Sequence, residues 1–187
     1  MKKFVVLFIA VLLSTPLMAQ DAPKAEVFGG YQYLHFGSSS DLGTSSGQGF
    51  NGWNAAGQFN FTKFAGVEGD FSGTYATISG VKTHVYTYTG GPVVFAYVGK
   101  IKPFVHVLFG GVRLTGTESG VSLTFSGYTA MAGGGVDVKV NKVLGVRLAQ
   151  FDWVYYHFGS QTVGDVQFSS ISGSKNVRIS TGIVARF

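Results

Sequence analysis

The C-terminal stretch 176–187, "NVRISTGIVARF", alternates without a break between two kinds of side chain. Successive side chains of an extended strand point to opposite faces. One face then carries Ile179, Ile183 and Phe187. Arg178 and Arg186 lie on the opposite face, among asparagine, serine and glycine. We therefore predict a terminal β-strand with an apolar face and a charged face. Whether the apolar face meets lipid or a protein core depends on the rest of the chain.

The same period of two recurs in seven earlier segments of roughly ten residues each. These segments span 26–36, 53–61, 66–75, 83–97, 103–114, 127–140 and 145–158. Tight turns and longer connections rich in Ser, Gly and Thr alternate between them, which is typical of antiparallel neighbours in an up-and-down sheet. Eight strands can close such a sheet and leave no free edge. The predicted fold is all-β, a closed eight-stranded antiparallel up-and-down β-barrel with four longer loops at one end.

Two strand irregularities are expected. Pro92 cannot donate a ladder hydrogen bond, so it predicts a break or bulge in or near segment 83–97. In the next-to-last segment, the alternation that points Arg147 inward would turn Asp152 outward. One extra residue near Ala149 would point both charges inward, so we predict a β-bulge there.

The composition indicates that the barrel spans a membrane. Aromatic residues make up 15% of the chain and charged residues 12%, about half of the usual charged fraction. The interior of an eight-stranded barrel is only just wide enough for its own side chains, so the many large aromatics are expected to face lipid. Candidate aromatics for the two lipid interfaces are Tyr31, Tyr33, Trp53, Phe61, Trp153 and Tyr155. A lipocalin-like barrel, secreted or periplasmic and with the two faces inverted, is the alternative.

The first residues have the layout of a secretory signal peptide. Lys2 and Lys3 precede an apolar run over 4–13, and Pro16 and Ala19 follow it. We predict a signal peptide over 1–19 and an outer-membrane barrel domain over 20–187. Without the two leader lysines, the 14 Lys and Arg fall to 12 against 9 Asp and Glu. Because these basic residues are scattered singly, the chain offers no track for nucleic acid.

Charged residues on the polar faces are expected to meet inside the barrel. They are Glu26, Glu68, Asp70, Asp137, Arg147, Asp152, Arg178 and Arg186. An unpaired charge in a narrow lumen is strongly unfavourable, so we predict a network of ion pairs and amides that fills it. Such a network either plugs the lumen or acts as a selectivity or gating element.

Several motifs together resemble a known class of proteins. They are "GYQYLHF", "GWNAAGQFNFTKFAGVEGDF", "KPFVHVLFGG", "GGGVDVKV" and "NVRISTGIVARF". In this order, over residues 25–187, the chain resembles the small eight-stranded outer-membrane barrels of the OmpA-like and OmpX-like type. The peptidoglycan-binding domain of full-length OmpA has no counterpart in the sequence.

This resemblance implies the cell outer membrane of a Gram-negative-type bacterium as the location. It implies outer-membrane lipid and lipopolysaccharide as partners, a monomeric barrel, and loops that bind an extracellular ligand. It also implies that Ile179, Ile183 and Phe187 form the C-terminal signal recognised by the barrel-insertion machinery. A structural or surface-interaction role with a polar, plugged lumen is expected, without a cofactor.

Two other functions remain open at this point. One is a narrow pore of low conductance. The other is a lipopolysaccharide-modifying barrel enzyme, for which His84, His106 and His157 are available, although no motif places them beside a serine and an acid. The similar stretches "YLHFGS" and "YYHFGS" also place His35 and His157 at one rim, but a metal site would lack a third ligand. We expect neither an enzyme nor a metal site.

Overall fold

The computed structural model describes residues 23–37, 47–78, 81–118, 121–159, 161–163, 166–168 and 171–187. The expected signal peptide over 1–19 lies outside the described residues. No helix in these ranges has the length and apolar character needed to cross a membrane.

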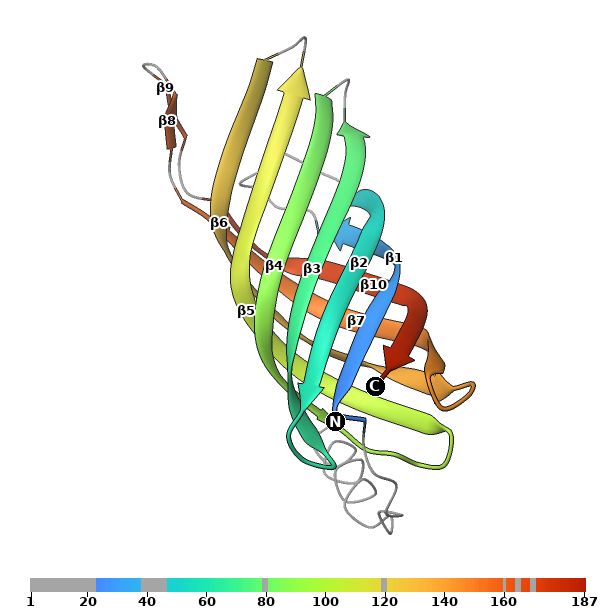
Figure 1. Ribbon diagram of the computed structural model, residues 1–187. Helices are drawn as coiled ribbons and strands as arrows, with labels where there is room; N and C mark the ends of the chain where they lie inside the picture. Colours follow the sequence, from blue (N-terminus) through green and yellow to red (C-terminus); the bar gives the residue numbers. More distant parts are fainter. Residues whose placement is uncertain are drawn as a thin grey trace, which may run out of the picture.

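The chain folds into a closed antiparallel barrel, which confirms the predicted fold class (Figure 1). The strands are β1 (Ala25–Phe36), β2 (Gln48–Asn60), β3 (Ala65–Ile78), β4 (Val81–Phe95), β5 (Ile101–Glu118), β6 (Val121–Lys139), β7 (Leu144–Phe158), β8 (Gln161–Val163), β9 (Val166–Phe168) and β10 (Ile171–Arg186). The barrel order is β1-β10-β7-β6-β5-β4-β3-β2, and β8 and β9 form a separate two-stranded sheet. Strand β10 closes the barrel by pairing with β1, and Glu26 of β1 lies opposite Arg186 of β10.

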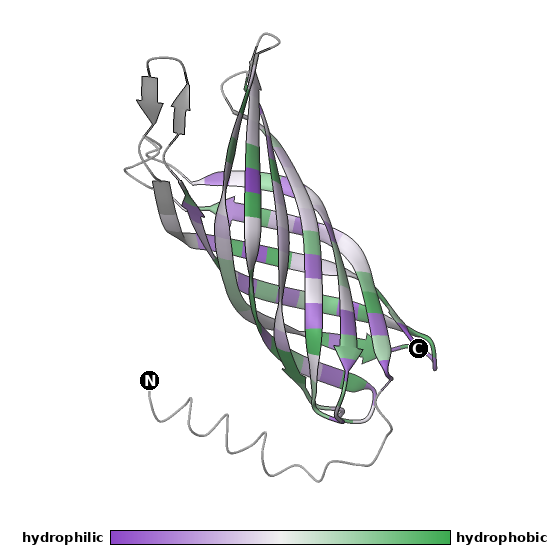
Figure 2. Cartoon of the chain, turned by 60° about the vertical axis from the view of Figure 1, so that its left-hand side comes forward, coloured by the Kyte–Doolittle hydropathy of each residue, from purple (hydrophilic) through white to green (hydrophobic). Residues whose placement is uncertain are grey.

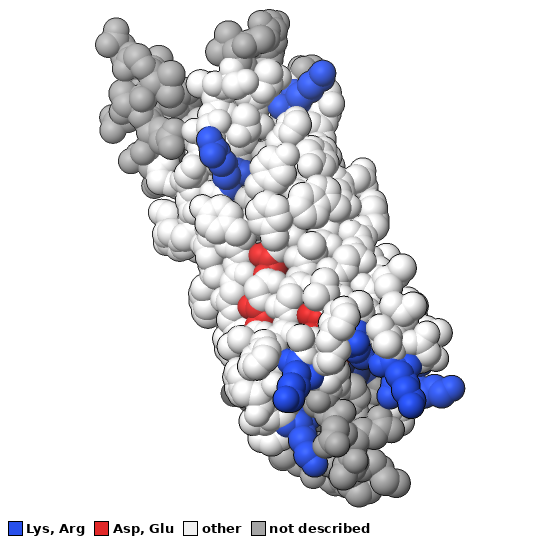
Figure 3. Space-filling model, viewed as in Figure 1, with Lys and Arg blue, Asp and Glu red and all other residues white. Residues whose placement is uncertain are grey.

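The wall of the barrel separates an apolar outside from an interior that contains the charges. Ile183 is 60% exposed and Phe187 68%, whereas Val184, next to Ile183, is fully buried. Figure 2 shows the resulting alternation of hydrophilic and hydrophobic bands along the strands. On the face drawn in Figure 3, Lys and Arg lie towards the two ends of the barrel. This arrangement is the one expected for a barrel that faces lipid.

The bulge predicted near Ala149 is confirmed. Ser180 of β10 pairs with Gln150, whereas Gly182 pairs with Arg147, so β7 holds one residue more than its partner in this interval. The pairing with β6 shifts at the same place. As a result, Arg147, Gln150 and Asp152 are all buried although simple alternation would separate them.

Of the break or bulge predicted at Pro92, the strand pairing shows a local break and no bulge. Pro92 pairs with Val67 of β3 in an unbroken register. On the other side, Gly90 pairs with Phe109 and Val93 with His106 in one common register, and the pairing with β5 omits only the two residues between. The missing N–H of proline therefore interrupts one ladder locally without bending the strand out of register.

Two of the four long loops expected at one end are strand instead. Strands β5 and β6 stay paired up to Glu118 and Val121, and β3 and β4 stay paired up to Ile78 and Val81. The hydroxyls of the Ser/Thr-rich stretches bond across the strands: Thr115 contacts Thr124 at 3.2 Å, and Thr117 contacts Ser122 at 2.8 Å. Such cross-strand pairs favour a sheet over a loop.

These extensions make one side of the barrel taller than the other (Figure 1). The pairing of β2 with β3 ends at Asn51 and Tyr75, and the pairing of β7 with β6 ends at Phe158 and Gly127. Beyond those pairs, β3 to β6 continue as a four-stranded sheet. The part of β3 to β6 beyond those pairs, called the protruding sheet, consists of residues 76–78, 81–83, 113–118 and 121–126.

Candidate functional site: a lumen in two layers

Arg178 connects opposite sides of the lumen. Its Nη1 and Nη2 donate to the two carboxylate oxygens of Asp70 at 2.7 and 3.1 Å. Its Nε donates to Oδ2 of Asp152 at 2.7 Å. All three side chains are buried, and they come from β10, β3 and β7. Charge-assisted, bidentate bonds of this kind are the strong ones, so Arg178 ties three strands together across the interior.

His106 of β5 extends this connection. Its Nε2 lies 2.7 Å from Oδ1 of Asp152, and its Nδ1 lies 3.2 Å from Oε1 of Glu68. The contact with Glu68 has ion-pair distance but not the alignment of a hydrogen bond. Both ring nitrogens therefore face carboxylates, and Glu68, His106, Asp152, Arg178 and Asp70 form one continuous chain of charged groups.

A second group of charges lies nearer the short turns. Nε of Arg147 donates to Asp137 at 2.8 Å, and its Nη1 donates to Gln150. The amide of Gln150 in turn donates to Asp152 at 2.8 Å, which joins this group to the chain above. The guanidinium of Arg147 lies between the rings of Phe28 and Phe104, 4.3 Å from each centroid. Aromatic faces stabilise a desolvated cation, so Arg147 is held by both charge and packing.

At the end with the short turns, Glu26 is the common acceptor. It accepts hydrogen bonds from Lys102, from Nε of Arg186 at 3.2 Å and from the hydroxyl of Tyr97 at 2.9 Å. Burial raises the pKa of the Tyr97 phenol, and the neighbouring Glu26 carboxylate raises it further. Tyr97 therefore stays protonated, and its hydroxyl donates a hydrogen bond to the Glu26 carboxylate.

The eight residues predicted for the lumen are all buried in it. Lys102 and His106 also belong to this network, although neither was predicted for it. Lys102 lies outside the predicted segment 103–114, because β5 begins earlier, at Ile101. Phe104 and His106 point into the lumen, so the alternation of a strand also points Lys102, two residues before Phe104, into the lumen.

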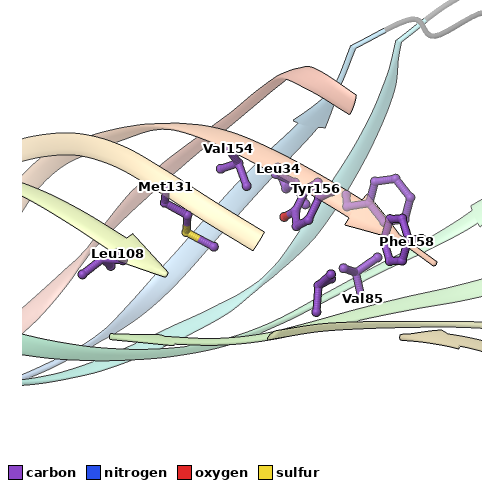
Figure 4. Close-up of a cluster of buried hydrophobic side chains, with 9 residues drawn as sticks. Leu34, Val85, Leu108, Met131, Val154, Tyr156 and Phe158 are labelled. Carbon is purple, nitrogen blue, oxygen red and sulfur yellow. The ribbon is translucent and has the colours of Figure 1, made fainter. Parts of the chain in front are cut away.

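The opposite half of the lumen is apolar. The buried side chains Leu34, Phe50, Val85, Leu108, Val112, Met131, Val154, Tyr156 and Phe158 form one cluster there, shown in Figure 4. Phe36 packs against it, with its ring 5.0 Å from that of Phe50 and 5.2 Å from that of Tyr156. The lumen therefore differs from the expected polar interior. Paired charges dominate one part of its length, and a large apolar cluster, with buried threonines such as Thr87 and Thr129 beside it, dominates the other.

The residues predicted for the lipid interface lie on the outer wall. Tyr31, Tyr33, Trp53, Phe61 and Trp153 are exposed, and Tyr155 is half-buried. Some of their polar atoms are bonded to neighbours, since Tyr31 donates to Asn51 and Nε1 of Trp53 donates to Tyr75 at 3.1 Å. Ile179, Ile183 and Phe187 are exposed on the same wall. Their roles in lipid contact and in insertion stay predictions.

The histidines do not come together. His84 packs edge-on against Tyr75, and the ring of His157 stacks on Tyr128 at 4.6 Å. His106 lies in the lumen. His35 and His157 pair with Val177 and Ser172 of β10, five residues apart along that strand. Among the described residues, no three His, Cys, Asp or Glu side chains gather as a metal site.

Solved structures share this architecture. Neisserial surface protein A (NspA) is similar with a TM-score of 0.67 and 12% identity, over 90% of this chain and all of that one. Ail, the attachment invasion locus protein of Yersinia pestis, has a TM-score of 0.57 and 16% identity, over 89% of this chain and 99% of Ail.

OprG from Pseudomonas aeruginosa has a TM-score of 0.53 and 9% identity, over 89% of this chain and 96% of OprG. No protein-family model matches the sequence, and no curated protein is similar to it in sequence. These likenesses show that the chain has the fold of the small eight-stranded outer-membrane barrels.

Proposed function

We propose that this chain is an integral barrel of the bacterial outer membrane that does not conduct, and that it acts through its wall and its protruding sheet. The observation that carries this proposal is the filling of the lumen by two layers of opposite character. The apolar cluster opposes the passage of ions, because apolar side chains cannot replace the water around an ion. Apolar solutes find no favourable contacts in a layer of paired charges.

Several further parts of this proposal follow from the outer wall. The exposed apolar side chains would contact membrane lipid on all sides and lipopolysaccharide in the outer leaflet. The terminal residues Ile179, Ile183 and Phe187 would serve as the signal for the barrel-insertion machinery. We propose a role without catalysis, which the separation of the three candidate histidines supports.

Conductance in planar bilayers tests the closed lumen. We expect no conductance steps from the unaltered protein. Arg178→Met alone, or Met131→Ser with Val154→Ser, should also remain closed, because each change opens one layer and leaves the other. The three substitutions together are expected to produce steps. Steps from the unaltered protein would instead support the narrow pore, and silence of the triple variant would show that neither layer is the barrier.

The protruding sheet supports the surface-interaction part of the proposal. Within the described residues, the pairing of β6 with β7 ends at Gly127 and Phe158, so over 121–124 the outer edge of β6 is paired with no described strand. An exposed edge offers unpaired N–H and C=O groups to an extended peptide, which can add as a further strand. The similar structure from Yersinia pestis is an attachment invasion locus protein. We propose that this edge of β6 binds an extended peptide segment.

A shortened hairpin tests this edge. Replacing residues 116–123 by Asn-Gly keeps the Thr115–Thr124 pair and closes β5 to β6 with a two-residue turn. On an array of extended hexapeptides we expect binding by the unaltered barrel and at least a tenfold loss in the shortened variant. Replacing 76–83 by Asn-Gly, after the Tyr75–His84 pair, is the matched control and should retain binding. Equal binding by both variants, or none by the unaltered barrel, would contradict the proposal.

A further inference from the structure

The three short turns, which join β2 to β3, β4 to β5 and β6 to β7, share one sequence pattern whose residues lie outside the lumen. Each reads apolar, any residue, lysine, apolar. The turns are Phe61-Thr62-Lys63-Phe64, Val98-Gly99-Lys100-Ile101 and Val140-Asn141-Lys142-Val143. The six apolar side chains are 47% to 64% exposed, and the three lysines are exposed beside them. Three separate turns thus present one ammonium group between two apolar side chains.

Each turn is held by hydrogen bonds within the turn itself. Oγ1 of Thr62 accepts from the N–H of Ala65 at 2.8 Å, and Oδ1 of Asn141 accepts from the N–H of Leu144 at 2.8 Å. In the remaining turn, Val98 and Ile101 exchange two backbone hydrogen bonds of 2.8 and 3.0 Å, and Gly99 has a φ of 63°. These internal bonds lower the cost of placing the turns next to the acyl region of a membrane.

The chain ends add a fourth lysine to the same end of the barrel. Lys24 directly precedes β1, and Ala25 exchanges two backbone hydrogen bonds with Phe187. We call Lys24, Lys63, Lys100 and Lys142 with their apolar neighbours the basic rim; part of it is visible at the lower end of Figure 3. The acidic residues nearest this end, Glu26 and Asp137, are buried inside the barrel. The rim therefore presents four lysines without an exposed Asp or Glu side chain among the residues whose burial is described, and the carboxylate of Phe187 is the one exposed anionic group at this end of the described chain.

We infer that the basic rim binds the phosphate headgroups of anionic phospholipids in the leaflet that faces the short turns. This inference rests on the proposed membrane location. The apolar neighbours continue the lipid-facing wall, since Val94 and Leu144 are exposed just above the turns. A lysine in this position can lay its aliphatic stem along apolar surface and place its ammonium at the headgroup level. A soluble anion or a carboxylated polymer would not need the apolar pair on either side of each lysine.

Lipid selectivity in reconstituted bilayers is the measurement. The probe is a spin-labelled phosphatidylglycerol, compared with spin-labelled phosphatidylcholine in phosphatidylcholine bilayers that contain the folded barrel. We expect the protein to prefer the anionic label by about fivefold at low salt, as basic residues near an anionic surface do. The preference should weaken at high salt, because exposed charges are screened. The variant with Lys63→Gln, Lys100→Gln and Lys142→Gln should show a ratio near one.

The opposite end of the barrel supplies the matched control. Lys82→Gln with Arg113→Gln removes two exposed cations from the other end of the wall and should leave the preference unchanged. An undiminished preference in the triple lysine variant, or an equal loss in the control, would overturn the inference. Lysine-dependent sedimentation with peptidoglycan, without any lipid preference, would also overturn it and identify a carboxylated polymer as the occupant.

A shift in gel mobility on boiling separates this outcome from failure of the proposed function. The unaltered protein and the triple variant should both run as folded barrels before boiling and unfold after it. A chain without that shift in membrane fractions would contradict the membrane barrel itself. A shift without lipid preference would contradict only the role of the basic rim.

Discussion

At the scale of single residues, Arg178 has the strongest effect on the fold. It pairs with both Asp70 and Asp152, and neither carboxylate is exposed to water. Removing one partner of a buried pair leaves an uncompensated charge, which costs about 3–5 kcal/mol. We therefore expect Arg178→Met to lower the free energy of unfolding by roughly that amount. Urea unfolding in lipid vesicles, followed by the fluorescence of Trp53 and Trp153, measures it.

Two further variants make this prediction specific. Arg113→Met removes an exposed cation of the outer wall and is expected to have little effect. Adding Asp70→Asn to Arg178→Met should recover part of the loss, because the amide can keep its contact with Asn54 without carrying a charge. If Arg113→Met were as destabilising as Arg178→Met, loss of a buried pair would not be the cause.

At the scale of elements, the contact between β1 and β10 closes the barrel and depends on two facing glycines. Gly30 pairs with Gly182, and a Cβ added at either position would overlap the backbone of the other strand and the ring of Phe28. We expect Gly182→Ala to lower stability by about 1–3 kcal/mol, as overpacking does. Gly29→Ala is the control, since a Cβ at Gly29 meets nothing within 4 Å. The folded fraction on unboiled gels at rising temperature measures both, and equal effects would contradict the steric explanation.

The elements also show what a single sequence can predict. The bulge near Ala149 was predictable because Arg147 and Asp152 carry charges that both have to avoid lipid. The extent of β5 and β6 was not, because Ser/Thr-rich stretches occur in loops as well as in strands. Their cross-strand hydroxyl contacts exist only once the two strands are in register.

At the scale of the whole molecule, alternation predicts which side chains share a face, and charge indicates which face is inside. It does not distinguish an apolar side chain in the lumen from one in lipid. Leu34 and Val154 are buried inside the barrel, whereas Ile179 and Ile183 are on its outer wall, although the residue types are alike. The apolar half of the lumen was missed for this reason. The repeated lysine turns were visible in the sequence, but their common location at one end needed the barrel.

The two layers of the lumen act as filters arranged in series with opposite preferences. On the proposed function, each part of the lumen is filled by its own side chains, so a substitution that opens one part leaves the other closed. The seal of the barrel then does not depend on any single residue, and it would survive the loss of either part.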